Sequence, residues 1–380
     1  MSKIKILFIP YTMTNGGGAE KVLSLLVNNL DSSKYDIRIQ EVHRFKNMIQ
    51  LNQNIKMGKP FFDDGILLQQ KIFRRIKLAL LCHAPWILKS LFRLYSYDVV
   101  ISFNYQLPSF MLPAFKKEKK IAWFHGDIFD LAEKGKIKVK EKQRKVWKTA
   151  DAIVTISNKS LHSLEVLFPE FMNKARIIHN GINLENARKL SKEKCDFDFG
   201  AIPTLICAGR LDENKNFALV IEAVSVLKKR SINCQLILLG EGEKEAELKK
   251  QVEALGLSDR IFFLGYQTNP YSYIACSKVM CISSFSEGWP MVTMEAMALG
   301  IPFVTTKVSG ASEELSDNGK CGLVSDWNAE EYADKLQKLL TDSELYEQMS
   351  KNCKEKAKEY SVEKYVAAFE KLLSDVGAGK

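Results

Sequence analysis

Short apolar runs alternate along the chain with stretches in which apolar residues recur at helical spacing. Runs of this length predict buried strands, and the stretches between them predict amphipathic helices. In the first half the predicted strands are 5–9, 37–42, 99–103, 121–124, 153–156 and 176–178. Strands and helices in alternation are typical of a parallel, doubly wound sheet.

Residues 195–203 interrupt this alternation and predict a linker. A second alternation follows, with strands at 204–208, 235–239, 261–264, 279–282 and 303–306 and helices at 217–229 and 244–255. Further helices are expected at 329–340, 343–358 and 361–376. We therefore expect an α/β protein with two Rossmann-like doubly wound domains, 1–190 and 200–360, since 380 residues suffice for two cores.

The amino-acid composition favours a soluble protein without a membrane-spanning segment or a zinc site. The apolar fraction of 46% and the charged fraction of 26% are those of an ordinary soluble protein, and no apolar run is long enough to span a bilayer. The first ten residues predict a buried strand rather than a signal peptide. The eight cysteines are scattered without a C-x-x-C pair, which favours reduced thiols in a cytosolic protein and argues against zinc.

Charge is distributed unevenly. Residues 1–190 hold 32 Lys and Arg against 16 Asp and Glu, a net +16, while residues 191–380 hold 23 against 29, a net −6. The basic residues gather at 66–95, among Trp and Phe, and at 116–120 and 135–148. Such segments suit an anionic membrane surface, although a solvated face is an equally simple explanation. Nucleic acid is disfavoured because no binding module is present.

The segment 286–298 carries the most specific chemistry. A predicted strand leads through Glu287 and Pro290 into a short helix, and Glu295 lies about one turn inside it. The first backbone N–H groups of that helix, on Met291, Val292 and Thr293, would form an anion site. Carboxylates repel phosphate, so we expect the two glutamates to accept hydrogen bonds from sugar hydroxyls beside that site.

Two further loops follow predicted strands. Arg210 and Lys215 come after the first strand of the second half, where doubly wound folds bind ligands, and they suit a phosphate clamp. The glycine-rich run 15–20, with Gly17 and Gly18, opens a helix after the first strand and permits close approach of a ligand. Its spacing does not match the G-x-G-x-x-G dinucleotide pattern.

These segments resemble the retaining nucleotide-sugar glycosyltransferases of family 4, of bacterial polysaccharide-biosynthesis type. The resemblance rests on E-x7-E at Glu287 and Glu295, on G-R-L-x-x-x-K at 209–215 and on the glycine loop. It implies the GT-B fold, in which an acceptor-side first domain and a nucleotide-sugar-binding second domain face each other across a cleft. Residues 361–380 would pack back on the first domain. In the family a histidine ends a strand beside the donor sugar, which points to His125. Pro290 and the bulky Trp289 depart from the usual pattern.

The resemblance implies a metal-independent hexosyl- or N-acetylhexosaminyltransferase that uses a nucleoside diphosphate sugar, most often UDP-linked, and no other cofactor. In that family the first glutamate of the E-x7-E motif contacts the donor sugar, and the second contacts the ribose of the nucleotide. The implied catalytic residues are Glu287, His125, Arg210 and Lys215. The implied donor-binding residues are Gly17, Gly18, Arg210, Lys215, Glu287, Met291, Val292, Thr293 and Glu295.

The acceptor expected from the basic first half is a saccharide or lipid-linked saccharide at the inner face of a membrane. The enzyme would then be cytoplasmic and peripheral, acting in capsule, surface polysaccharide or glycolipid synthesis. Three alternatives stay open: a sugar-nucleotide 2-epimerase of the same architecture, a phosphorylase-type relative, and a non-enzymatic basic adaptor at the membrane surface.

Overall fold

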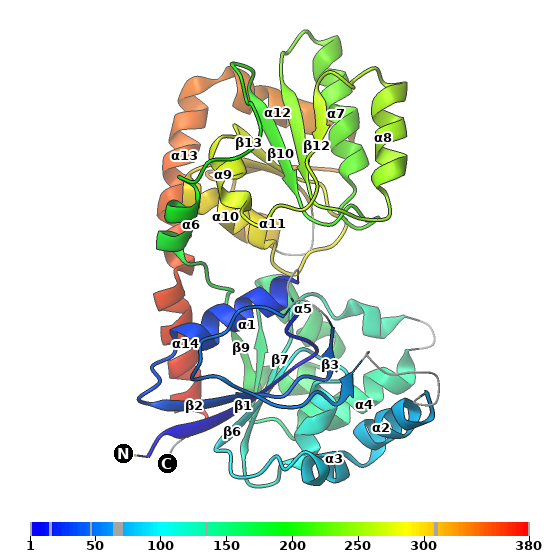
Figure 1. The fold of residues 1–380 in the computed structure, drawn as a ribbon, viewed down its shortest axis with the longest axis vertical. Coiled ribbons are helices and arrows are strands. Elements are labelled where there is room, and N and C mark those ends of the chain that lie inside the picture. Colours follow the sequence, from blue (N-terminus) through cyan, green and yellow to red (C-terminus); the bar gives the residue numbers. More distant parts are fainter. Residues whose placement is uncertain are drawn as a thin grey trace. The chain divides into compact units, whose positions relative to one another are not determined.

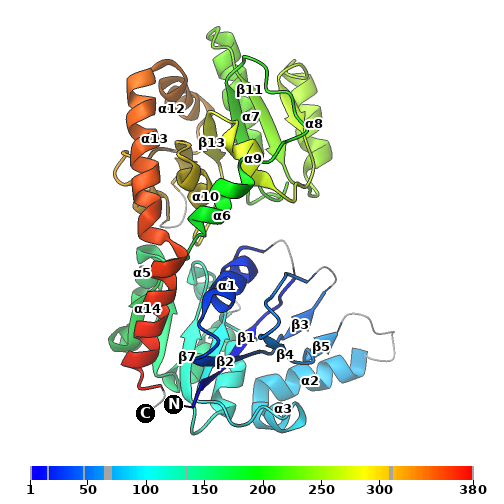
Figure 2. The same cartoon turned by 60° about the vertical axis from the view of Figure 1, so that its left-hand side comes forward.

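The computed structural model describes residues 2–14, 17–45, 48–63, 71–133, 136–307 and 311–378. The chain divides into two compact units (Figures 1 and 2). The first comprises 1–181 together with 362–380, and the second comprises 182–361. Both units contain a parallel sheet with helices on its two faces, which confirms the predicted α/β class with two Rossmann-like folds.

The first unit is built on a seven-stranded sheet among the described residues. In spatial order its strands are β4 (Lys56–Met57), β2 (Tyr35–Ile39), β1 (Ile4–Pro10), β6 (Val99–Phe103), β7 (Lys119–Trp123), β8 (Ala152–Thr155) and β9 (Ala175–Ile177). All neighbours pair in parallel. The pairs Ile6↔Val99 and Ile101↔Ile121 fix the central register. Beside this sheet lie the short strands β3 (His43–Arg44) and β5 (Phe62–Asp63), which the sequence pattern did not predict.

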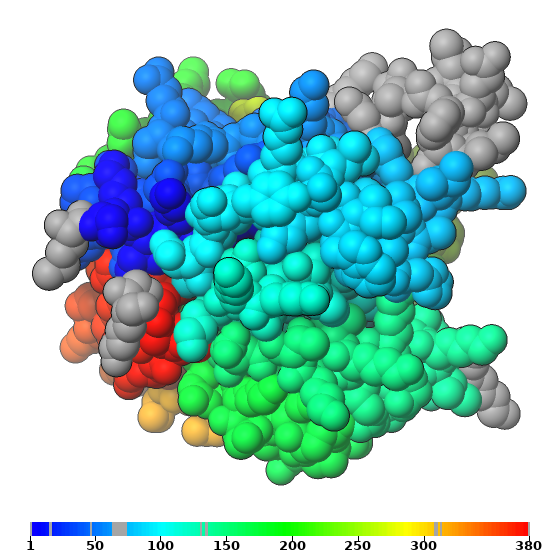
Figure 3. Space-filling model, turned by 90° about the horizontal axis from the view of Figure 1, so that it is seen from below, coloured from blue at the N-terminus to red at the C-terminus, as the bar shows by residue number. Residues whose placement is uncertain are grey.

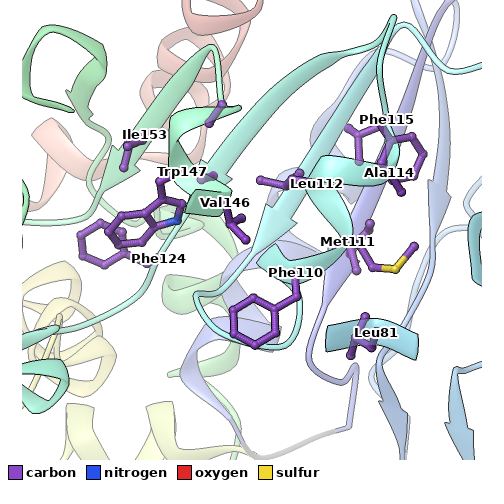
Figure 4. Close-up of a cluster of buried hydrophobic side chains, with 14 of the residues drawn as sticks. Leu81, Phe110, Met111, Leu112, Ala114, Phe115, Phe124, Val146, Trp147 and Ile153 are labelled. Carbon is purple, nitrogen blue, oxygen red and sulfur yellow. The ribbon is translucent and has the colours of Figure 1, made fainter. Parts of the chain in front are cut away.

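Alternate residues of these strands face different helices. On one face β1 packs against α14 (Val362–Asp375), with the rings of Phe8 and Phe369 5.9 Å apart, and α14 in turn contacts α1 (Gly18–Asn29). The last helix thus belongs to the first unit although it is remote in sequence. The other face holds the apolar cluster shown in Figure 4, with the rings of Phe124 and Trp147 stacked and 5.4 Å apart. Its helices are α2 (Lys71–His83), α3 (Pro85–Leu91), α4 (Ile137–Lys148) and α5 (Asn158–Leu167).

Helices α2 and α3 lie on the face of the first unit that Figure 3 views. The sequence pattern predicts one helix-length stretch over 66–95, of which residues 66–70 lie outside the described residues. The described part is two helices, because Pro85 has no N–H for a continuing helix and instead occupies the first turn of α3.

The second unit contains a six-stranded parallel sheet among its described residues. In spatial order its strands are β12 (Ile261–Phe263), β11 (Gln235–Leu239), β10 (Thr204–Ala208), β13 (Val279–Ile282), β14 (Phe303–Thr306) and β15 (Gly322–Ser325). Its helices are α6 (Leu184–Leu190), α7 (Phe217–Lys229), α8 (Glu245–Ala254), α9 (Pro270–Ala275), α10 (Met291–Leu299), α11 (Ala311–Ser316), α12 (Ala329–Thr341) and α13 (Ser343–Ala357). The sequence pattern predicted five of these strands and omitted β15.

The boundary between the units lies earlier than the sequence indicated. The linker was expected at 195–203, yet the division falls after Gly181, so α6 belongs to the second unit. The physical reason is packing: α6 contacts α9 and α10, and the Asn269 side chain donates to the Leu190 carbonyl at 2.9 Å.

At the carboxyl edge of the second sheet, the loops after β10 and β11 pack backbone against backbone. Gly240 has φ +133°, and a Cβ there would lie 1.9 Å from the Gly209 carbonyl oxygen. A Cβ on Gly242 would lie 2.3 Å from the Leu211 carbonyl oxygen. Two backbone hydrogen bonds hold the loops together. The Leu211 N–H donates to the Glu241 carbonyl at 3.0 Å, and the Lys244 N–H donates to the Leu211 carbonyl at 2.9 Å.

Replacing Gly240 by alanine should therefore destabilise the second unit by about 3 kcal/mol or more, because both the backbone conformation and the neighbouring carbonyl reject a Cβ. The matched control is Gly256→Ala, which has φ +63° but nothing within 4 Å of the new Cβ, and which should cost only about 1–2 kcal/mol. Melting temperatures of the three proteins measure the difference. Equal losses in the two variants would contradict the close packing.

Candidate functional site

The loop after β10 presents two cations that one carboxylate organises. Arg210 donates through Nε to Asp212 Oδ2 at 2.9 Å, and 74% of its side chain is exposed. The other oxygen, Asp212 Oδ1, accepts the backbone N–H of Lys215 at 3.0 Å. Asp212 thus fixes the base of the Arg210 guanidinium and leaves its outer N–H groups directed toward solvent, where an anion can reach them. The sequence analysis had assigned no role to Asp212.

Lys215 joins this loop to the one after β13. Its Nζ donates to Glu287 Oε1 at 2.5 Å, and the two side chains are only 19% and 15% exposed. Ser284 Oγ donates to the same carboxylate oxygen at 2.8 Å. Because β10 and β13 are neighbours in the sheet, their loops meet at its carboxyl edge and form one polar cluster. The predicted phosphate ligand and the predicted sugar ligand are therefore bonded to each other.

Backbone and side-chain hydrogen bonds hold the two loops rigidly together. The Asn214 side chain donates to the Ser286 carbonyl at 2.9 Å and accepts the Ser286 N–H at 3.1 Å. Ser283 Oγ donates to the Lys215 carbonyl at 2.7 Å. Asn216, the N-cap residue of helix α7, has a left-handed φ of 47°. The loops on which Lys215 and Glu287 lie are thus restrained independently of the ion pair.

Helix α10 begins at Met291, where Pro290 occupies the N-cap position and has no side-chain oxygen to offer. The first N–H groups of a helix have no intrahelical acceptor, so those of Met291 and Val292 remain the predicted anion donors. The Thr293 N–H was predicted to be a third anion donor. In the structure this group already donates to the Pro290 carbonyl at 3.0 Å. Thr293 instead holds a buried hydroxyl with no hydrogen-bond partner among the described residues.

Glu295 lies one turn further along α10, 4% exposed. The hydroxyl of Tyr271, from α9, donates to Glu295 Oε1 at 3.4 Å. Burial, and then the negative charge of Glu295, raise the pKa of Tyr271, so this hydroxyl keeps its proton. The two glutamates of the E-x7-E motif thus have different partners, Lys215 with Ser284 for one and Tyr271 for the other.

Trp289, the bulky departure from the usual motif, is 5% exposed and packs edge-on against Tyr360, with ring centroids 5.3 Å apart. Its Nε1 faces the sulfur of Met294. The indole is therefore part of the second unit's core rather than a group projecting from the loop.

In the first unit, Gly17 is the N-cap of α1 and Gly18 is its first residue. The preceding residues of the predicted glycine loop, Asn15 and Gly16, lie outside the described residues. A Cβ on Gly17 would lie 1.8 Å from Glu20 Oε2, at the end of a flexible side chain.

His125 follows β7, and its ring lies 4.3 Å from that of Phe103. The residue is partly exposed, but both ring nitrogens are buried and find no hydrogen-bond partner in the described parts of the chain. Burial lowers the pKa of His125 to about 3, so the imidazole is neutral at physiological pH. As a neutral ring it can donate or accept a hydrogen bond but carries no charge. Two unpartnered nitrogens are the state expected of a side chain that a ligand completes.

Across the described residues, no group of three or more His, Cys, Asp or Glu side chains is placed to hold a metal ion. None of the described helices has the length and apolar character that a membrane crossing requires.

Two family models match consecutive parts of the chain. Residues 16–186 match Glycosyltransferase Family 4, and residues 199–356 match Glycosyl transferases group 1. The chain belongs to the family 4 glycosyltransferases of the GT-B fold. The first match contains Gly17, Gly18 and His125, and the second contains the whole polar cluster around Lys215 and Glu287.

Individual relatives agree with this glycosyltransferase family. An uncharacterized glycosyltransferase of Methanocaldococcus jannaschii is 26% identical over 60% of this chain and 64% of its own length. A Campylobacter jejuni α-1,4-N-acetyl-D-galactosaminyltransferase, named for an acceptor on PP-undecaprenol, is 25% identical over 98% of this chain and 99% of its own. The crystal structure of Anabaena HepE in complex with UDP has the same fold, with a TM-score of 0.76 at 17% identity, covering 98% of this chain and 100% of that one.

The neutral state of His125 can be observed directly. The Cε1–H proton resonance of His125, identified by its loss in His125→Asn, should keep its neutral position from pH 8 to pH 5, because the folded-state pKa is about 3. In urea-unfolded protein the same resonance should titrate near the ordinary value of about 6.5. The associated stability is present above about pH 6.5 and is lost as pH falls toward 3. A folded-state midpoint near 6.5 would show that the nitrogens are hydrated.

Proposed function

We propose that this family 4 glycosyltransferase moves a hexosyl or N-acetylhexosaminyl unit from a nucleoside diphosphate sugar, UDP-linked, to a saccharide or lipid-linked saccharide with retention of the anomeric configuration. The observation that carries the proposal is the contact between Lys215 and Glu287. A phosphate-binding cation and a sugar-binding carboxylate lie in one cluster, beside the first turn of α10. The UDP bound to HepE, which shares the fold, supports the choice of nucleotide.

Transfer requires the bond between the sugar C1 and the diphosphate oxygen to break, with the electron pair leaving on phosphate. Arg210 and the N–H groups of Met291 and Val292 would stabilise that developing charge without a metal ion. Lys215 has three ammonium protons, so it can remain bonded to Glu287 while it donates to phosphate. The acceptor hydroxyl would attack C1 on the face that the phosphate leaves, and its proton would pass to the departing phosphate oxygen.

Glu287 would accept hydrogen bonds from donor-sugar hydroxyls, and its negative charge favours the cationic character at C1. Glu295 would bind the ribose, with Tyr271 orienting its carboxylate. The unpartnered hydroxyl of Thr293, buried in the first turn of α10, supports the assignment of an anion site there. Gly17, Gly18 and neutral His125 would contact the donor from the first unit.

We further propose that the enzyme is peripheral at the inner face of a membrane and acts in surface polysaccharide, capsule or glycolipid synthesis. Trp86 and Ile87 are adjacent at the start of α3, Leu91 lies one turn after Ile87, and the three side chains are 60%, 44% and 63% exposed. Exposed Arg74 and Arg75 precede them on α2. Apolar side chains bordered by cations are suited to an anionic lipid interface. The Campylobacter relative, named for a lipid-linked acceptor, points the same way.

Not every predicted basic residue contributes to this face. Lys89 is bonded to Glu118 at 2.7 Å and is only 14% exposed, and Lys77 donates to the Phe61 carbonyl at 3.0 Å. The charge of the proposed membrane face therefore comes from Arg74, Arg75 and Arg93, with Lys116 and Lys117 also exposed.

The function is tested by incubating the protein with radiolabelled UDP-glucose, UDP-galactose, UDP-N-acetylglucosamine and UDP-N-acetylgalactosamine in excess EDTA, with and without bacterial lipid extract. We expect sugar transfer with one donor, and an anomeric coupling constant in the product that shows retention. Arg210→Ala should lower turnover about 10²- to 10³-fold. The matched control is Arg230→Ala, which removes an arginine paired with Glu330 and Asp334 at the other end of α7 and should have no effect.

A strict requirement for manganese or magnesium, or an inverted product, would contradict the proposed mechanism. Conversion of the donor into its 2-epimer without transfer would instead favour an epimerase. Absence of both reactions with every donor, in a protein that binds none of them, would favour the adaptor.

Substitutions of Glu287 and of Glu295 should affect turnover and UDP binding differently. Glu295→Ala removes a hydrogen bond to the ribose and should weaken UDP binding by about 1–3 kcal/mol. Glu287→Gln keeps the size of the side chain and removes its charge, so it should lower turnover more than UDP affinity. Calorimetry with UDP measures both, with Glu355→Ala on the exposed face of α13 as the control. Unchanged UDP affinity in Glu295→Ala would contradict the ribose assignment.

Binding to vesicles of phosphatidylglycerol and phosphatidylcholine should fall steeply with ionic strength, since each basic residue near an anionic surface contributes about 1 kcal/mol and salt screens it. Arg74→Glu with Arg75→Glu should weaken co-sedimentation, and so should Trp86→Ala with Leu91→Ala. The control is Lys228→Glu with Lys229→Glu, an adjacent exposed pair on the second unit. Equal losses in both charge-reversed proteins, or no binding at low salt, would contradict a specific membrane face.

A further inference from the structure

Two aromatic side chains remain exposed at the carboxyl edge of the second sheet, and nothing in the proposed donor site uses them. Phe285 follows β13 and is 48% exposed, and Trp327 follows β15 and is 43% exposed. Their ring centroids lie 6.2 Å apart with an interplanar angle of 31°. Because the two exposed rings are in contact, they form one continuous apolar surface at the edge where doubly wound sheets bind ligands, and such a surface indicates a contact site.

The pair is tied to the proposed catalytic cluster. Trp327 Nε1 donates to the Ser284 carbonyl at 3.3 Å, and the hydroxyl of Ser284 donates to Glu287 at 2.8 Å. The Phe285 N–H donates to the Asn214 carbonyl at 2.8 Å. The two rings are therefore held at a fixed position next to Glu287 rather than carried on an independent loop.

The order of the strands shows on which side of Glu287 the Trp327 ring lies. From one end the sheet runs β12, β11, β10, β13, β14, β15. Arg210 and Lys215 follow β10, whereas Trp327 follows β15, on the opposite side of β13 and its Glu287. The proposed ribose ligand Glu295 contacts Tyr271 of α9, the helix that follows β12. Trp327 thus lies on the side of Glu287 away from the proposed phosphate and ribose ligands. Phe285 precedes Glu287 in the same loop and contacts Trp327 from there.

We propose that Phe285 and Trp327 form a platform on which a pyranose ring of the acceptor saccharide stacks. This inference rests on the proposed transferase function and adds, to the acceptor side expected of the first domain, an acceptor contact on the second unit. A sugar ring has an apolar C–H face that packs on aromatic rings and a rim of hydroxyls that needs polar partners. Such partners border the pair: the exposed ion pair of Lys307 and Asp326, at 2.7 Å, and the backbone of Ser286.

Saturation-transfer NMR tests the platform without requiring turnover. The probes are the α and β methyl glycosides of glucose, galactose, N-acetylglucosamine and N-acetylgalactosamine, with UDP present. We expect wild-type protein to saturate the C–H protons on one face of at least one glycoside. Phe285→Ala and Trp327→Ala should each lower its affinity about 3- to 10-fold. Ile202→Ala is the matched control, because Ile202 is 41% exposed but precedes β10, at the opposite edge of the sheet.

Trp327→Phe separates stacking from positioning, since it keeps an aromatic ring and removes the bond to Ser284. Retained glycoside affinity in Trp327→Phe supports the platform. Loss of affinity equal to that of Trp327→Ala would mean that Trp327 acts through Ser284 and Glu287, and would overturn it. The affinity for UDP should stay within about twofold of wild type in all these variants.

Three other results would overturn the proposal: no saturation of any glycoside by wild type, glycoside affinities unchanged in both alanine variants, or a selective loss of UDP affinity, which would make the pair a base-binding surface. Failure of the proposed transferase function would be seen separately, as absence of sugar transfer by wild type with every donor. Where transfer is measurable, the two alanine variants should raise the KM for acceptor 3- to 10-fold and leave hydrolysis of the donor without acceptor unchanged.

Discussion

The ion pair between Lys215 and Glu287 joins the two loops on which the proposed donor chemistry depends. About four fifths of each side chain is buried, and removing such charges from water is costly unless each is paired and further hydrogen-bonded. Ser284 supplies a further bond to the carboxylate, and Asn214 and Ser283 restrain the two loops. The attraction is stronger here than in water because the local dielectric constant is low. The arrangement thus keeps a cation and a carboxylate poised side by side before any ligand arrives.

A second constraint lies in the backbone. The loops after β10 and β11 approach so closely that a side chain at Gly240 or Gly242 would overlap a carbonyl group of the neighbouring loop. This packing fixes the segment that carries Arg210 and Lys215 from one side, while the loop after β13 fixes it from the other. A site that must stabilise charge at a defined atom benefits from such rigidity, because preorganised dipoles need no rearrangement during the reaction.

Much of the fold could be predicted because its signals are local. Every segment predicted as a strand proved to be one, and the helix over 217–229 was predicted to the residue. The elements that the sequence did not predict also have local causes. Strand β15 has only four residues and starts with glycine, and β3 and β5 have two residues each, too few to show any periodicity. The stretch over 66–95 looked continuous because helical spacing persists across Pro85, yet proline ends one helix and starts another.

The sequence alone determined the α/β class, the family and the residues that carry the motifs, since those depend on order along the chain. Only the tertiary structure decided how these residues are used. Lys215 and Glu287 are 72 positions apart, and the sequence could not show that they are bonded to each other rather than each to a ligand. The neutrality of His125 arises from burial of its nitrogens among residues of other strands. Phe285 and Trp327 meet because β13 and β15 lie on either side of β14. Burial, pairing and the strength of a charge depend on neighbours in space, and folding alone brings those neighbours together.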